Sequence, residues 1–449
     1  MRKKVVEGSV LFASIVKWLF LAACIGVIVG VSTAVFLKLL GLGISGAAQY
    51  RYYYLLLPAA LFLSALIVKI FAPDAEGHGT EKIIEAVHRH SGKMNVRIVP
   101  VKLVATVITI AFGGSAGKEG PAAQIGAALS SAFSGLLRFN DRDRKKLVIC
   151  GISAGFAAVF GTPIAGALFG VEVLFVGTML YDVLLPSFVA GIIGYQVSSS
   201  LGVAYFHEPI SILPAFSSYF FLKICLAGLF FGLCSLILIE TLGLFERLSH
   251  RVPIGKPLKG LIGGSALVLL SLLFSTHYLG LGLETIKSVL DGSAAPHGAF
   301  LLKMLFTAIT LSFGGSGGIV TPIFFVGATA GSVFGSVLGF DMALFSAIGM
   351  VSLLAGAANT PISASIMAIE LFGPQIAPYA AVACVISFLM TGHRSVYPSQ
   401  VLSLSKSSSL TVSKGREMRD VRDVVFEPGR EGIGSRIMKG FKRLKKSEK

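Results

Sequence analysis

The sequence predicts an all-α polytopic membrane protein built from two inverted-topology repeats with broken helices. Three observations lead to this fold class: the chain is 54% hydrophobic and only 14% charged, long apolar runs recur along it, and one glycine-rich motif occurs twice. A soluble domain carries about 25% charged residues, so a water-soluble fold of 449 residues would lack the charges to cover its surface. One membrane domain accounts for this composition better than several soluble domains.

Four apolar runs with few or no charges predict membrane helices, since about 20 such residues cross a bilayer and a helix satisfies its own backbone groups there. They are Trp18–Leu40, Tyr53–Ala72, Tyr219–Leu242 and Gly260–Phe274. Two further runs, Leu302–Phe313 and Ile323–Phe334, are too short or too glycine-rich for simple spans and predict broken or tilted helices. The first run continues without a cleavage pattern of small residues, so we expect a retained helix rather than a signal peptide.

The net charge of +16 comes largely from lysines and arginines in the tails and in one middle loop. Such enrichment marks cytoplasmic segments, so we expect a multi-pass protein of the cell membrane with both termini in the cytoplasm. Beside so many spans, a basic tail favours attraction to anionic lipids over nucleic-acid binding. The five cysteines lack metal-ligand spacing and predict free thiols, and we expect no metal and no cofactor.

An internal repeat divides the chain. The segment Thr109–Pro121 recurs as Thr310–Pro322, and a Thr-Pro-Ile triplet followed by a glutamate, Glu172 or Glu370, recurs farther on. We therefore expect a first transmembrane repeat over residues 1–205, a linker over 206–215, a second repeat over 216–400 and a basic cytoplasmic tail over 401–449. In transporters with such repeats the binding site lies near the midplane, where interrupted helices meet. Inversion would let both glycine-rich loops face one site.

The glycine-rich loop Gly113–Pro121 predicts an anion site. Its glycines let several N–H groups converge, and a helix beginning near Pro121 adds the positive end of its dipole. A phosphate-binding loop does not fit, because its spacing requires glycine where Phe112 lies and serine or threonine where Glu119 lies. The alternative is that the glycines serve only close helix packing.

Glu119 lies within this loop, and an intramembrane carboxylate is a functional candidate by default. At a helix N-terminus among amides, the carboxylate can occupy the position of an anion, and it vacates that position when it is protonated or swings away. The equivalent residue of the second repeat is Val320, so the two halves differ here. A glutamate that merely caps its own helix is the alternative.

The segment Gly117-Lys-Glu-Gly-Pro121 resembles the Gly-Arg/Lys-Glu-Gly-Pro signature of the CLC chloride channel and transporter family, and Gly318-Ile-Val-Thr-Pro322 resembles its second signature. The similarity covers roughly residues 20–400 and is to the prokaryotic type, without CBS domains. It implies a homodimer whose subunits each hold an anion pathway gated by Glu119. It also implies an anion-binding set of His78, Gly79, Gly117, Lys118, Gly318, Ile319, Val320, Thr321 and Tyr397.

Three positions depart from the family pattern. The signature that usually reads Gly-Ser-Gly-Ile-Pro is Gly77-His-Gly-Thr-Glu81 here, so His78 replaces the anion-contacting serine and Glu81 replaces the proline. Val173 stands where proton-coupled members carry an internal glutamate, and Val320 stands where many chloride members have phenylalanine. The fluoride-exporting branch also departs from the family pattern at the signature serine, which tilts the prediction slightly toward that branch, while chloride remains the default for the family.

The predicted function is therefore transport of small inorganic anions, chloride or fluoride, either as a channel or as an anion/proton antiporter. A proton-coupled fluoride exporter is the narrower alternative. A polytopic membrane enzyme is the alternative from another class, although the histidines and carboxylates form no nucleophile–base set. The expected partners are the anion, protons, membrane lipids and a second copy of the chain.

Several side chains outside the loops carry expectations of their own. If residues 78–90 are helical, four side chains that could bind a metal share one face: His78, Glu81, Glu85 and His88. We expect a solvated amphipathic helix, capped near Gly79 or Thr80, rather than a metal site. Glu172 and Glu370 are expected to cap or pair helices. An amphipathic helix around Ile433–Leu444 is a possible surface tether. Three lysines near the ends of apolar runs are expected to reach the headgroups: Lys102, Lys223 and Lys303.

Overall fold

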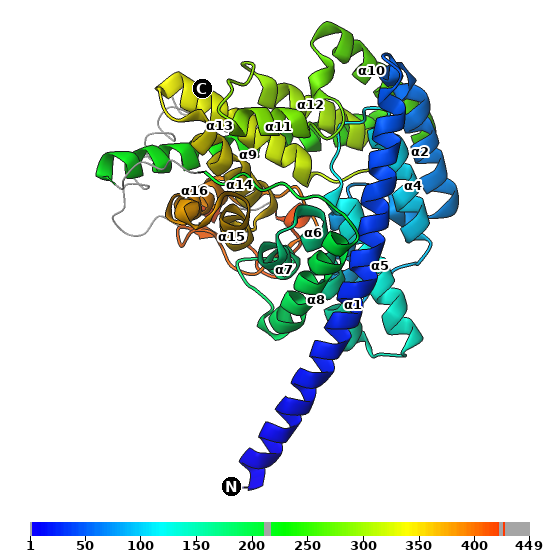
Figure 1. The fold of residues 1–449 in the computed structure, drawn as a ribbon, viewed down its shortest axis with the longest axis vertical. Helices are drawn as coiled ribbons and strands as arrows, with labels where there is room; N and C mark the ends of the chain where they lie inside the picture. Colours follow the sequence, from blue (N-terminus) through cyan, green and yellow to red (C-terminus); the bar gives the residue numbers. More distant parts are fainter. Residues whose placement is uncertain (1, 211–216, 422–424, 427–449) are drawn as a thin grey trace.

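The computed structural model describes residues 2–210, 217–421 and 425–426. Eight α-helices lie in each half of this described part of the chain (Figure 1). The first half holds α1 (Arg2–Ala48), α2 (Leu57–Phe71), α3 (Thr80–Arg89), α4 (Ile98–Ala111), α5 (Glu119–Leu136), α6 (Asp141–Phe160), α7 (Pro163–Glu172) and α8 (Tyr181–Ser200). The second half holds α9 (Ser218–Arg251), α10 (Lys256–Leu273), α11 (Leu283–Leu290), α12 (Ala299–Ser312), α13 (Val320–Leu338), α14 (Met342–Ala358), α15 (Pro361–Phe372) and α16 (Ala377–Met390). The described strands are β1 (Phe175–Val176), β2 (Val401–Leu402), β3 (Leu410–Thr411) and β4 (Val425–Phe426).

Long apolar helices carry the predicted spans. The four apolar runs correspond to α1, to α2 with the short 3-10 helix before it, to α9 and to α10. Six described helices are long and apolar enough to cross a membrane, and shorter apolar helices lie between them and after the last of them along the chain. The outer faces of α1, α9 and α10 expose many leucine and isoleucine side chains, as a lipid-facing surface requires. Figure 1 shows the amino-terminal part of α1 extending beyond the other helices.

The two runs predicted as broken helices differ in length. The first forms α12, which has 14 residues and stops ahead of a glycine-rich loop. The second, Ile323–Phe334, is the middle of the longer helix α13, which has 19 residues. A Cβ atom at Gly327 or Gly331 would collide with the backbone of α14. These two glycines therefore let α13 and α14 pack closely rather than end the helix.

The two halves cap each other's helices. The Glu172 carboxylate, at the end of α7, accepts hydrogen bonds of 3.0 and 2.8 Å from two N–H groups in the first turn of α15. Glu370, on α15, accepts bonds of 2.9 and 2.8 Å from two N–H groups in the first turn of α7. Helix N-termini leave such donors without intrahelical partners, so both glutamates cap helices as predicted. Each repeat therefore caps a helix of the other, as expected if a twofold axis relates the two repeats.

Glu172→Ala should lower the free energy of unfolding by about 2 kcal/mol, since it leaves two N–H groups at a largely buried helix start without acceptors. Glu172→Gln should lose less, because its amide oxygen still accepts one hydrogen bond. The thermal unfolding midpoint of the purified protein in detergent measures both effects. A Glu172→Ala midpoint equal to that of the wild type would contradict the capping role.

Two of the lysines that were expected to reach the headgroups are instead buried inside the fold. Lys102 and Lys303 occupy equivalent places on α4 and α12, and neither has exposed surface. Each ammonium donates to two backbone carbonyls, in the loop before α3 or the loop before α11, at 2.5 to 3.0 Å. The prediction was wrong because these loops supply the hydrogen-bond acceptors that a buried ammonium needs. The third lysine, Lys223, lies over the rings of Tyr219 and Phe340.

The chain after residue 400 packs against the first half. Strand β2 pairs in parallel with β1, and the N–H groups of Met418 and Arg419 donate to main-chain carbonyls of residues 400 and 398. The predicted boundary at residue 400 therefore does not coincide with a break in packing. The amphipathic helix predicted around Ile433–Leu444 lies outside the described residues.

Candidate anion site

The two glycine-rich loops meet inside the fold. Gly117 and Gly318 form an isolated antiparallel bridge in which each N–H donates to the carbonyl of the other residue at 2.6 Å. Beside the bridge, one serine N–H of each loop donates to a threonine hydroxyl of the other repeat, at 3.0 Å in both cases. Gly113 and Gly314 turn the chain at positive φ angles of 100° and 110°, which glycine adopts without a steric penalty. This arrangement brings the amino ends of α5 and α13 together.

Glu119 is the first residue of α5 and has no exposed surface. Its Oε2 accepts a hydrogen bond from the Thr321 N–H at 3.1 Å, and its Oε1 accepts one from the Thr321 hydroxyl. The carboxylate therefore lies at the amino end of α13, where free N–H groups and the helix dipole favour an anion. A glutamate that only caps its own helix would not make these bonds to the other repeat. Helix α5 begins slightly before Pro121, near which its start was predicted.

The start of α3 closes the site from a third side. Gly79 has a φ of 84°, and the backbone here packs so closely on Gly120 that a Cβ on either glycine would collide with a carbonyl oxygen across the contact. The centroids of the His78 and Tyr397 rings lie 5.6 Å apart. The His78 Nδ1 and the Tyr397 hydroxyl are buried without a well-formed hydrogen bond in the described part of the chain, although the Thr80 side chain lies near the hydroxyl. Buried polar atoms normally have partners, so this pair is a candidate contact for a polar ligand.

The structure brings most of the residues implied by the resemblance into two adjoining groups. Around Glu119 lie Gly117, Gly318, Ile319, Val320 and Thr321, and at the start of α3 lie His78, Gly79 and Tyr397. Lys118 is half-buried next to Glu119 and forms no ion pair with any described residue. Sequence reasoning missed the close contact at Gly120 and the bond between Ser399 and Glu81. For the bond to Ser399, the available signal in the sequence was Glu81 itself, a glutamate at a signature position that is usually proline.

The four side chains considered as metal ligands point to different partners. His78 faces a tyrosine ring, Glu81 accepts hydrogen bonds from a serine, Glu85 accepts one from a lysine, and His88 Nε2 lies 3.0 Å from a backbone carbonyl oxygen. They do not converge on a common point, and the described residues hold no other group of His, Cys, Asp or Glu placed for a metal. Helix α3 begins directly after Gly79, as the amphipathic alternative predicted.

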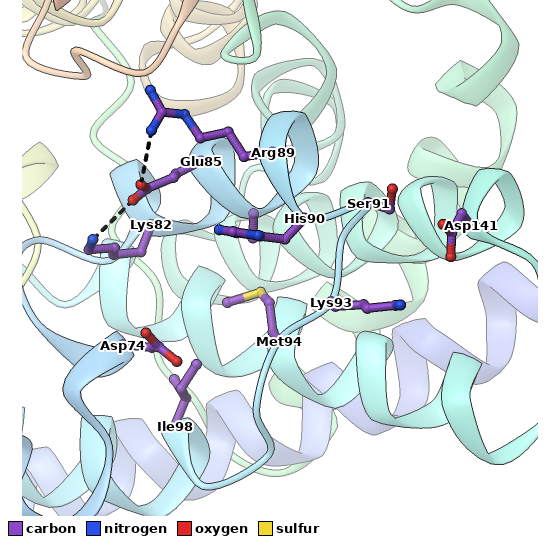
Figure 2. A pocket seen from close by; sticks show the side chains of 11 residues that line it. Asp74, Lys82, Glu85, Arg89, His90, Ser91, Lys93, Met94, Ile98 and Asp141 are labelled. Carbon is purple, nitrogen blue, oxygen red and sulfur yellow. Dashed lines mark hydrogen bonds and ion pairs between the residues drawn. The ribbon is translucent and has the colours of Figure 1, made fainter.

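A cavity of about 630 Å³ lies beside α3 rather than at the site (Figure 2). Figure 2 shows Glu85 between Lys82 and Arg89, with ion pairs of 2.9 and 3.9 Å to the two cations. The hydrogen bond from Lys82 lowers the pKa of the Glu85 carboxyl. Because both signs of charge line this cavity, its electrostatics do not favour an anion. Neither Glu119 nor Tyr397 lines it.

The sequence pattern described as the voltage gated chloride channel family matches residues 58–392. The chain belongs to this CLC family. A chloride/fluoride channel protein of Pseudomonas syringae pv. tomato is 38% identical over 403 residues, which cover 87% of this chain and 88% of the relative. A voltage-gated ClC-type chloride channel of Shigella flexneri is 30% identical over 340 residues, which cover 71% of this chain and 79% of the relative.

Solved CLC structures have the same fold as this CLC protein. A CLC-type fluoride/proton antiporter has a TM-score of 0.82 at 29% identity, with 86% of this chain and 98% of that chain covered. A slow cyanobacterial Cl⁻/H⁺ antiporter has a TM-score of 0.73 at 20% identity, with 83% and 94% covered. The predicted all-α polytopic fold is confirmed, and the chain is a multi-pass membrane protein of a channel and transporter family.

Proposed function

We propose that this CLC protein exports fluoride in exchange for protons, through a pathway gated by Glu119 in each subunit of a homodimer. Membership of the family supports anion transport. The relatives support fluoride, since the 38% identical protein is named for chloride and fluoride. The fluoride/proton antiporter also has a higher identity and TM-score than the chloride/proton antiporter. The proposal places both termini in the cytoplasm, because lysine and arginine gather in the tails.

The position of the Glu119 carboxylate is the observation that carries the proposal. It accepts the N–H and hydroxyl hydrogen bonds of Thr321 at the amino end of α13, and an anion in the pathway needs the same donors. An anion that takes these donors obliges the carboxylate to take up a proton or to move away, because two negative charges repel each other at this distance. Competition for one position therefore couples anion movement to proton movement.

The donor set suits a small and strongly hydrated anion. Fluoride gives up its water only where strong, closely spaced donors replace it, and the Thr321 hydroxyl adds such a donor to the backbone N–H. Val320 contributes a small buried side chain beside these donors, with no aromatic ring. On the other side, the His78 ring and the Tyr397 hydroxyl offer the next polar contacts along the path.

The proton needs a route that does not use an internal glutamate, since the equivalent residue is the buried, apolar Val173. In this proposal Glu119 carries the proton itself, because it leaves the Thr321 donors in its neutral form and returns to them ionised. A passive channel, in which Glu119 only opens and closes the path, is the alternative within transport.

Purified protein in liposomes tests the proposed function. A fluoride gradient should drive protons in the opposite direction without any added substrate, and the reversal potential should follow both gradients. Fluoride flux that ignores a pH gradient would identify a channel instead. If the protein moves neither fluoride nor chloride, the proposed transport function is wrong, and a membrane enzyme is the alternative that remains.

Val320→Phe and Tyr397→Ala should both change anion selectivity. The phenylalanine adds apolar bulk beside the Thr321 donors, which favours a larger and less hydrated anion, and the alanine removes a polar contact from the path. We expect the fluoride-to-chloride permeability ratio to fall about tenfold, the equivalent of roughly 1.4 kcal/mol. Reversal potentials in mixed fluoride and chloride gradients measure this ratio. Val337→Phe, at an exposed position of α13, is the control, and unchanged ratios in both variants would remove these residues from the path.

A further inference from the structure

We infer that Glu81 is a positioning residue that holds Tyr397 on the anion path, an inference that rests on the proposed function. The family signature has proline at this position, whereas here a carboxylate projects from the first turn of α3. The residue just before this helix cap, His78, faces the Tyr397 ring. Glu81 thus lies on the element that forms one side of the path and bonds to the segment that forms the other.

Glu81 binds the segment that carries Tyr397. The Ser399 N–H donates to the two carboxylate oxygens of Glu81 at 3.0 and 3.2 Å, and the Ser399 hydroxyl donates to Oε1 at 2.5 Å. Ser399 is fully buried, and the Glu81 side chain is only 16% exposed. Hydrogen bonds to an ionised carboxylate are among the strongest in proteins. Only Pro398 separates Ser399 from Tyr397, so this bond acts directly on the tyrosine backbone.

The segment that follows the second repeat contributes Arg419, which contacts both partners of the Glu81–Ser399 hydrogen bond. The Arg419 guanidinium donates to Glu81 Oε1 at 3.3 Å and to the Ser399 hydroxyl, and the Arg419 N–H donates to the main chain of the tyrosine segment at 3.0 Å. Farther along α3, Arg89 forms bidentate bonds of 2.6 and 2.8 Å with Glu417. Residues 417–419 therefore tie α3 and the tyrosine segment into one unit.

The Tyr397 ring depends on these backbone ties for its position. Its hydroxyl makes no well-formed hydrogen bond within the described residues, so the main chain on either side sets where the ring lies. On one side the Tyr397 N–H donates to the Ser395 hydroxyl at 2.9 Å. On the other side Glu81 binds Ser399. Loss of the Glu81 bond would therefore loosen the far side, where the bonds from Arg419 remain, and would widen the gap between the His78 and Tyr397 rings.

Hydrogen exchange of residues 395–401 in the full-length protein tests the tie without reference to transport. We expect exchange about tenfold faster in Glu81→Ala, since a buried backbone hydrogen bond is lost. Glu81→Gln keeps an acceptor oxygen and should remain close to the wild type. Glu85→Ala is the matched control, because Glu85 lies on the same helix and pairs with Lys82 and Arg89. Unchanged exchange in Glu81→Ala would overturn the inference.

Transport measurements in liposomes test the consequence. In Glu81→Ala the apparent KM for fluoride should rise about tenfold, the effect of roughly one lost donor in a binding site, and the preference for fluoride over chloride should weaken. Both values should be close to those of the wild type in Glu81→Gln, and they should be unchanged in Glu85→Ala. If Glu81→Ala does not fold, Ser399→Ala takes its place, since it removes the hydroxyl bonds with Glu81 and Arg419 and keeps the bond from the Ser399 N–H to Glu81.

The two arms separate failure of the inference from failure of the proposed function. A wild-type protein that moves no anion would contradict the proposed function, while the exchange measurement would still decide whether Glu81 ties the segment. Faster exchange in Glu81→Ala with wild-type KM and selectivity would show that the tie exists but does not position Tyr397 for transport, and the inference would fall.

Discussion

In Glu119→Gln, a pH gradient should no longer drive fluoride against its own gradient. The glutamine side chain has nearly the same shape, and its single amide oxygen can accept the Thr321 N–H bond while its NH2 group faces the Thr321 hydroxyl, which can accept. The amide does not titrate. Neutralisation therefore removes the step in which anion and proton exchange at one position. Proton and fluoride fluxes recorded from the same liposomes, with a pH-sensitive dye and a fluoride electrode, measure the coupling directly.

Glu119→Asp is the matched control for this variant. Aspartate keeps a titratable carboxyl and shortens the side chain by one methylene, so we expect slower transport that is still coupled to protons. If Glu119→Gln moved protons at the wild-type stoichiometry, the role assigned to Glu119 would be wrong. A loss of coupling in both variants would instead point to geometry rather than protonation.

Gly120→Ala should push apart the elements that form the site, although it adds only one methyl group. A Cβ at this position would collide with the His78 carbonyl oxygen and approach Gly318 to 3.1 Å. Because backbone atoms cannot rotate away as a flexible side chain can, α3 and the loops must separate. Overpacking of this kind costs about 1–3 kcal/mol. We expect a lower thermal unfolding midpoint in detergent and a fall in fluoride flux of about tenfold or more, since misplaced site groups lose their effect steeply.

Gly135→Ala provides the control on the same helix. A Cβ at Gly135 would have no neighbouring atom within 4 Å, and alanine is favoured over glycine inside a helix by roughly 0.5–1 kcal/mol. This variant should therefore be as stable as the wild type, or slightly more so, with full flux. Wild-type flux in Gly120→Ala would contradict the tight contact between α3 and the site.

Sequence alone was sufficient for the fold class and for the two repeated glycine-rich loops that meet in the structure, because each depends on chemistry that is local in the chain. Apolar runs must be helical in lipid. A glycine-rich loop before a helix leaves free N–H groups, so both copies of the motif could be assigned before their contact was known. Glu119 stood out because a carboxylate is costly in an apolar segment. Glu172 and Glu370 were expected to cap or pair helices from their matching positions in the repeat.

Only the tertiary structure decided which distant groups meet. Lys102 and Lys303 look like headgroup-seeking lysines until the fold places carbonyl oxygens next to them. Glu81 looked like an irregularity in a signature, and its partner Ser399 lies on the opposite repeat. The Thr321 donors reach Glu119 only because the two loops pair in antiparallel fashion. Such contacts depend on how helices pack in space, and residue type and spacing along the chain do not specify which atoms of two distant segments come within hydrogen-bond distance.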